Sequence, residues 1–263
     1  MPVCTKTLEG EKMYDFQKAN MWKRISAALC DFILICIVAV GFALLLSTVL
    51  GYDGYIERFD ELKESYEEKY DIDLEKSYSS LTEEERVKYD EADKEFAQDA
   101  DANYLYSMIM NLTFIIVIFS ILLGYVLLEF VIPLIFKNGQ TVGKKIFGIA
   151  VMREDGVRIS PMLLFVRTVL GKYTVETMLP ILIIVMIFLG AMGIVGVVVV
   201  AAILITQIVL LIVTKARTPL HDVLSHTVTV DYASQLIFDS VEDMIAYKKK
   251  IHAEQVESEK SDN

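Results

Sequence analysis

The sequence predicts an all-α integral membrane protein with about four transmembrane helices, an extracytoplasmic helical hairpin and a small cytoplasmic β element. The 263 residues are 54% hydrophobic and have a mean hydropathy of +0.45, which exceeds what a soluble core requires. Apolar runs long enough to cross a bilayer recur along the chain. Outside one acidic segment, most basic residues flank those runs, as they do beside membrane spans.

The first predicted span, 24–50, follows a polar segment, 1–23, whose lysines place it in the cytoplasm. The 26 residues after Arg24 give about 39 Å of helix, enough to cross a hydrocarbon core of about 30 Å. The run contains one acidic residue, Asp31, which costs about 2.5–3.5 kcal/mol on insertion scales. We therefore expect Asp31 to face other helices, where Arg24 or a guanidinium group from a distant part of the chain neutralises it.

The acidic segment is the insert 51–103, which has 19 acidic and 7 basic residues, a net charge of −12. Aromatic residues recur at helical spacing from Tyr55 to Tyr70, and Thr82 to Glu85 has the pattern of a capping box. These features predict an extracytoplasmic helical hairpin. It is either a solvated hairpin with a thin aromatic seam, or a vestibule that attracts cations or a protein partner.

The second span is expected within 104–136 and has Glu129 near its inner end. This carboxylate either lies at the interface or faces the helix bundle. A glycine-rich loop follows, with seven basic and two acidic residues between Lys137 and Lys172, which predicts a cytoplasmic position. Its spacing differs from that of a nucleotide-binding P-loop. The candidate loop positions are Gly139, Gln140, Thr141, Gly143 and Lys144.

Residues 149–159 contain two β-prone runs around an Asp-Gly turn, which predicts a small hairpin at the membrane surface. The alternating segment 226–232 is expected to add a strand to it. Residues 162–176 predict an amphipathic or partly re-entrant helix. Arg167 in this helix either snorkels to the interface or points inward to a carboxylate.

The apolar run 178–213 is too long for one span, because 36 residues give about 54 Å of helix. A break at 190–193 predicts two short helices, which gives four spans with both chain termini in the cytoplasm. Residues 231–263 are predicted to form a cytoplasmic amphipathic helix and a disordered tail of about a dozen residues.

These residues resemble the RDD family of membrane proteins, named for an arginine that starts the first span and for two aspartates. Arg24 and Asp31 match the arginine and the first aspartate, and Asp222 looks like the second. The glycine-rich stretch 138–144 is similar to the loop that follows the family's second span.

The resemblance covers 22–50 and 104–230, and it implies an RDD-like membrane domain made of 24–50 and 104–230. The insert 51–103 departs from the shorter loop that joins the first two spans in the family. The resemblance also implies a function in transport, with sodium/proton exchange proposed for some members.

Two functional hypotheses follow. In the first, the protein is a transporter or ion-coupled exchanger, Asp31 binds the proton or cation, and Arg24 sets its protonation. In the second, it is a non-catalytic scaffold or assembly factor, and the charged residues form a structural network. Both hypotheses use the candidate residues Arg24, Asp31, Glu129, Arg167 and Asp222.

An enzymatic function is not expected, because the sequence contains neither HExxH nor GxSxG. Three histidines and no CxxC motif indicate neither a metal site nor another cofactor. The expected environment is the lipid bilayer of the plasma membrane, with no nucleic-acid partner. A homo-oligomer, a cation or small-molecule substrate and a protein partner at the acidic insert are all compatible with the sequence.

Overall fold

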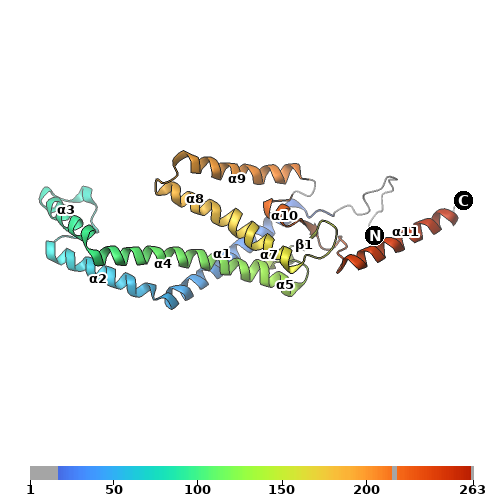
Figure 1. Ribbon diagram of the computed structural model, residues 1–263, viewed down its shortest axis with the longest axis horizontal. Helices are drawn as coiled ribbons and strands as arrows, with labels where there is room; N and C mark the ends of the chain where they lie inside the picture. The colour runs from blue at the N-terminus through green and yellow to red at the C-terminus, as the bar shows by residue number, and fades with distance from the viewer. Residues whose placement is uncertain (1–16, 215–217, 262–263) are drawn as a thin grey trace. The chain divides into compact units, whose positions relative to one another are not determined.

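The structure is a computed structural model that describes residues 17–214 and 218–261. The described chain is mostly helical (Figure 1). Its elements are α1 (Met21–Leu50), α2 (Tyr52–Tyr70), η1 (Tyr78–Ser80), α3 (Glu83–Gln98), α4 (Ala100–Tyr125), η2 (Val126–Val131), α5 (Ile132–Phe136), α6 (Val142–Ile146), β1 (Ile149–Arg153), α7 (Pro161–Phe165), η3 (Val166–Met178), α8 (Leu179–Phe188), α9 (Gly193–Val213), α10 (Leu220–Leu224), β2 (Thr227–Asp231) and α11 (Val241–Ser261).

The chain divides into two compact units. One unit is Val38–Ile121, and the other consists of the described residues on either side of it. We call them the insert unit and the main unit, and each is described by itself.

Four helical segments are long and apolar enough to cross a membrane, which confirms the predicted number of spans for the described residues. They are Met21–Leu50, Ala100–Phe136, Pro161–Phe188 and Gly193–Val213. Only 6% to 28% of the most apolar window of each span is buried in the protein. Most of these side chains therefore face outward, as expected where lipid is the surrounding solvent.

The third span begins earlier than the sequence indicated. Residues 162–176, predicted as a separate amphipathic or re-entrant helix, form the first half of the span Pro161–Phe188. The charged residues Arg167, Lys172 and Glu176 lower the hydropathy of this segment, so the sequence does not indicate a span there. Each of these side chains has an oppositely charged or histidine partner, so the fold compensates part of the cost of burying them.

The third and fourth spans meet at the predicted glycine break. Helix α8 ends at Phe188 and α9 begins at Gly193. Gly190 and Gly193 have φ angles of 72° and 48°, a left-handed conformation that glycine adopts at low cost. This conformation allows the chain to reverse within a few residues.

The second and third spans each contain a π-helical segment, η2 and η3. Threonine hydroxyls donate to backbone carbonyls in this region, Thr168 to that of Glu129 at 2.9 Å and Thr177 to that of Lys172 at 2.9 Å. The side chains therefore supply part of the hydrogen bonding that a disturbed α-helical ladder loses.

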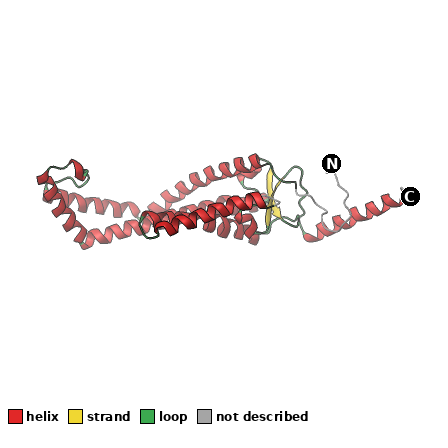
Figure 2. Cartoon of the chain, turned by 90° about the horizontal axis from the view of Figure 1, so that it is seen from above, coloured by secondary structure: helices red, strands yellow, loops and turns green. Residues whose placement is uncertain are grey.

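The β element differs from the predicted hairpin. The Asp-Gly turn forms, but beyond it the two runs share a single bridge, between Met152 and Arg158. Strand β1 pairs instead with β2 in antiparallel register, as the alternating pattern of the later segment suggested. Ala150 and Met152 pack against Val228 and Val230, so the more distant strand buries more apolar surface. Figure 2 shows the two strands in yellow at one end of the helices of the main unit.

The insert unit contains the predicted helical hairpin, formed by α2 and α3. Phe96 lies edge-on against Phe59 and Tyr66, with ring centroids 5.6 and 5.2 Å away, which is the expected aromatic seam. Thr82 and Glu85 form a complete capping box. A small core lies beside this seam and consists of Ile72, Leu81 and Ala92. The extracytoplasmic position of the hairpin stays a prediction.

The two ends of the chain also differ in part from expectation. Helix α11 extends to Ser261, where a disordered tail was predicted, and it begins at Val241 because Ser240 accepts a hydrogen bond from the backbone of Asp243. At the other end, residues 1–16 of the predicted N-terminal segment lie outside the described residues. Lys18 forms a bridge to Val230 of β2.

We predict that Thr82→Ala destabilises the hairpin by about 1 kcal/mol, because the amide of Glu85 loses its side-chain acceptor. Amide hydrogen exchange of 83–98 in the full-length protein should then be roughly fivefold faster. Thr82→Ser keeps the hydroxyl and should exchange like the wild type. Unchanged protection in Thr82→Ala would show that the capping box adds nothing.

Candidate functional site

The main unit brings charged residues from several elements to the same end of the spans. Arg24 lies at the start of the first span, Glu129 near the end of the second and Arg167 near the start of the third. Asp222 follows the fourth span, on α10. Ion pairs join these four positions, because Asp222 contacts Arg24 and Arg167, and Arg167 also faces Glu129.

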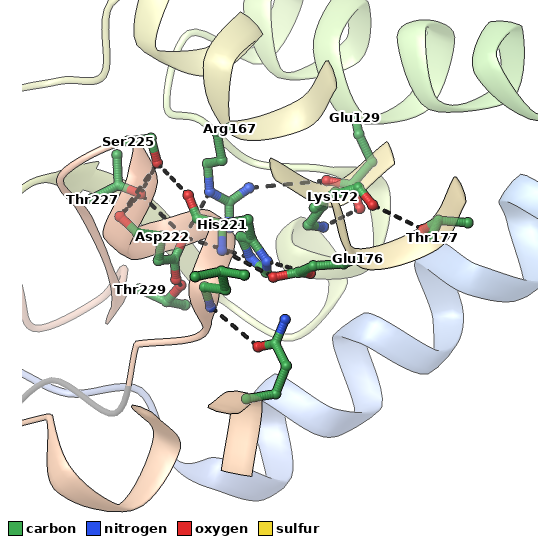
Figure 3. A network of polar contacts seen from close by, with 12 residues as sticks. Glu129, Arg167, Lys172, Glu176, Thr177, His221, Asp222, Ser225, Thr227 and Thr229 are labelled. Atoms are coloured by element: carbon green, nitrogen blue, oxygen red, sulfur yellow. Dashed lines mark hydrogen bonds and ion pairs between the residues drawn. The ribbon is translucent and has the colours of Figure 1, made fainter. Parts of the chain in front are cut away.

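We call the resulting set of side chains the buried charge cluster, and Figure 3 labels its members on the second and third spans and on α10. Its members are Arg24, Glu129, Lys144, Arg167, Lys172, Glu176, His221 and Asp222. Arg167 and Asp222 lie at its centre and are 1% and 0% exposed. At this depth an unpaired charge would be strongly destabilising, so the pairing of each member determines what the cluster can do.

The carboxylate of Asp222 receives the largest number of polar contacts in this group. Arg167 donates from Nε to Oδ1 at 2.7 Å, and the hydroxyls of Thr227 and Thr229 donate at 3.1 and 3.3 Å. Nη2 of Arg24 lies 3.9 Å from Oδ2. Burial by itself raises the pKa of Asp222, but the charge and the hydrogen bond of Arg167, together with the charges of His221 and Arg24, outweigh it and hold this pKa below its usual value.

The carboxylate of Glu129 faces three cations and is 2% exposed. Oε1 accepts a hydrogen bond from Nζ of Lys172 at 2.5 Å. Oε2 lies 3.7 Å from Nζ of Lys144 and 4.0 Å from Nη1 of Arg167. Glu129 therefore faces the bundle, and Arg167 points inward, between two carboxylates.

Glu176 and His221 form a further pair that was absent from the sequence-based candidates. Glu176 accepts from the backbone amide of His221 at 2.9 Å and contacts its Nδ1 at 2.8 Å. Burial lowers the pKa of His221, so the ring is neutral at pH 7. A Cβ on Gly171 would lie 2.7 Å from that of His221, so a glycine allows this approach. Correct placement of the third span would have identified Glu176 as an intramembrane carboxylate.

Asp31 has different partners from those expected. The guanidinium groups of Arg24 and Arg167 both contact Asp222. In the described structure, neither of them forms an ion pair with Asp31. Asp31 instead accepts a short hydrogen bond from the hydroxyl of Thr141 and one from the backbone amide of Gly143 at 2.7 Å. It is 4% exposed. A hydroxyl and an amide therefore bind the carboxylate, and we call this set of contacts the Asp31 clamp.

The glycine-rich loop connects the clamp to the sheet and to the cluster. Gln140 donates from its side chain to the carbonyl of Ile149 at 2.9 Å. Gly139 has a φ of 61° and leaves no room for a Cβ beside Val151. The hydroxyl of Thr141 accepts from the backbone amide of Lys144 at 3.3 Å, and this lysine points to Glu129.

The cluster and Asp31 together contain equal numbers of opposite charges when His221 is neutral. The acidic members are Asp31, Glu129, Glu176 and Asp222, and the basic members are Arg24, Lys144, Arg167 and Lys172. Among the described residues, no group of three or more His, Cys, Asp or Glu side chains is arranged to hold a metal ion.

The family model for the RDD family matches residues 18–226, which is most of the chain. No curated protein and no solved structure matches the sequence. The chain belongs to the RDD family. Of the residues that carry the resemblance, Arg24 and Asp222 contact each other, whereas Asp31 binds the glycine-rich loop.

We predict that Asp222→Asn destabilises the protein by about 3–5 kcal/mol, because Arg167 is left buried without its nearest counter-charge. Thermal unfolding of the purified protein measures this. Glu83→Gln removes a carboxylate that is 90% exposed and paired with Arg86. This control should cost less than about 1 kcal/mol. Similar losses in both variants would contradict a central role of the buried pair.

We predict that Gly143→Ala releases the Asp31 clamp. A Cβ at this position would lie 2.4 Å from the carbonyl oxygen of Ala27 and 2.8 Å from Oδ1 of Asp31. The expected cost is about 1–3 kcal/mol, seen as a lower midpoint of thermal unfolding. Gly41→Ala is the matched control, because nothing lies within 4 Å of a Cβ there. The clamp is unimportant if both variants unfold at the same temperature.

Proposed function

We propose that this multi-pass membrane protein of the RDD family is an ion-coupled transporter that exchanges protons for cations and catalyses no chemical reaction. The observation that supports this proposal best is the pair Glu129 and Lys144, a buried carboxylate and a buried amine with Nζ 3.7 Å from Oε2. Buried ionisable groups of this kind are rare in membrane proteins and often mark ion pathways.

Lys144 is the group best placed to release a proton at physiological pH. Burial lowers its pKa to about 8, although Glu129 and Asp31 favour the charged form. Lys172 and Arg167 add to the lowering by repulsion. Lys144 is therefore mainly protonated below about pH 8 and mainly neutral above it.

Loss of this proton changes the charge of the buried charge cluster and Asp31, which together are otherwise balanced. The neutral amine leaves one carboxylate charge without a counter-charge, and a cation near Glu129 would then restore the balance. Protonation of Lys144 would repel that cation again. One proton and one cation thus compete for the same buried charge. This competition gives exchange with a fixed stoichiometry, and the net charge of the site does not change.

The local helix geometry is compatible with such a site. Glu129 lies on η2, and Arg167, Lys172 and Glu176 lie on η3, so the cluster members of these two spans are on π-helical segments. Departures from the α-helix are frequent at functional sites, and interrupted helices form ion sites in many transporters.

We propose a plasma-membrane location with both chain termini in the cytoplasm. The basic segment between Lys137 and Lys172 supports this orientation, because positively charged loops remain on the inner side. The buried charge cluster would then lie at the cytoplasmic end of the spans, and the acidic hairpin outside the cell.

A scaffold or assembly factor is the second candidate, and the balance of acidic and basic charges favours it. A group of buried side chains whose acidic and basic charges balance can have the sole role of holding helices together. In this case the acidic hairpin is the natural contact for a protein partner. The two functions differ in whether neutralising Glu129 abolishes ion flux.

We predict that Glu129→Gln abolishes exchange. Proteoliposomes with an imposed pH gradient and an internal pH-sensitive dye receive pulses of NaCl or KCl, and wild-type protein should dissipate the gradient faster than empty liposomes. Glu129→Gln should reduce that rate at least tenfold, and Glu254→Gln, at an exposed position on α11, should not change it. Wild-type flux equal to that of empty liposomes would favour the scaffold.

We also predict the pH dependence of exchange. Because Lys144 loses its proton as the pH rises through about 8, cation uptake by the wild type should increase over that range. In Lys144→Met this increase should disappear. Lys145→Met, an exposed position next to it, should retain the wild-type profile. An unchanged profile in Lys144→Met would assign the titration to another group.

A further inference from the structure

Glu129 has one buried oxygen, Oε2, that lies near a buried nitrogen of Lys144 and a buried nitrogen of Arg167. These atoms are Oε2, Nζ and Nη1, and none has a hydrogen-bond partner among the described residues. We infer that these atoms, which belong to η2, α6 and η3, bind a single water molecule. This inference concerns a ligand site and holds whether or not the protein moves ions.

The distances fit a bridged contact. Nζ of Lys144 and Nη1 of Arg167 lie 3.7 and 4.0 Å from Oε2 of Glu129. Both distances are longer than the range of about 2.7–3.2 Å that is usual for direct N–H···O hydrogen bonds. Polar atoms that face each other beyond about 3.5 Å are commonly joined by an ordered water.

Other contacts of the same side chains hold the three atoms apart. Glu129 accepts from Lys172 through its other oxygen at 2.5 Å, and Arg167 donates from Nε to Asp222 at 2.7 Å. The backbone amide of Lys144 donates to the hydroxyl of Thr141 at 3.3 Å. The contacts of Glu129 and Arg167 therefore limit how far these two side chains can move to close the gap.

The chemistry of the three atoms selects the ligand. Two of them are donors and one is an acceptor, so the ligand must accept two hydrogen bonds and donate one. A water molecule does this, and buried waters typically make about three hydrogen bonds. Lys144 and Arg167 repel a metal cation while both are charged, and Glu129 repels an anion.

The site depends on the position of the glycine-rich loop. Lys144 is next to Gly143, whose amide binds Asp31 in the first span. The Asp31 clamp therefore holds the lysine amine over a glutamate and an arginine that come from two other spans. An ordered water at this point would indicate that the loop is held in this position, and it would give Lys144 an immediate proton acceptor.

A structure of the full-length protein in lipid nanodiscs, at a resolution that resolves water, tests the inference. We expect one density peak of water strength within about 3.2 Å of all three atoms. The inference is overturned if no peak is present and the atoms form direct hydrogen bonds, or if the peak is a stronger scatterer such as chloride.

Lys144→Met provides a second test. Removal of one donor should abolish the peak, whereas Lys145→Met should retain it, because Nζ of Lys145 lies 3.8 Å over the ring of Phe136. Persistence of the peak in Lys144→Met would assign the water to other groups. The wild-type structure decides the question by itself if Lys144→Met does not fold.

Discussion

One buried guanidinium group connects the elements at the charged end of the main unit. Arg167 donates to Asp222 at 2.7 Å and faces Glu129 at 4.0 Å, and all three side chains are no more than 2% exposed. A buried cation of this size is tolerated only where carboxylates surround it, so the second span and α10 both pack against the third span. The position of Asp222 then places β2, which follows α10 directly, and with it the small sheet.

The two family aspartates of this chain are stabilised by different chemistry. Asp222 binds guanidinium and hydroxyl groups, whereas Asp31 binds the hydroxyl of Thr141 and the amide of Gly143. This division leaves Arg24 and Arg167 available to Asp222. It also ties the loop after the second span to the first span, and Lys144 reaches Glu129 only because that loop is held in place.

Two structural predictions were wrong because a local sequence pattern does not show which distant residues become partners. The start of the third span was missed because hydropathy counts Arg167, Lys172 and Glu176 as polar, although their partners make them compatible with a membrane. The pairing of the two runs beside the Asp-Gly turn was overestimated. Local turn chemistry indicates that two segments are close, but not which partner strand buries more surface. Features that depend on a few neighbouring residues, such as the capping box at Thr82, agreed with expectation.

The sequence by itself determined the membrane class, the number of spans, the glycine break between the last two and the helical hairpin, because lipid solvation and local backbone chemistry act on contiguous residues. It also indicated which charged residues require partners. Only the tertiary structure decided which partners those are. Opposite charges attract one another at any separation in the chain, so the packing of the spans selects the carboxylate that each guanidinium group reaches. The same packing leaves Asp31 to bind a loop amide.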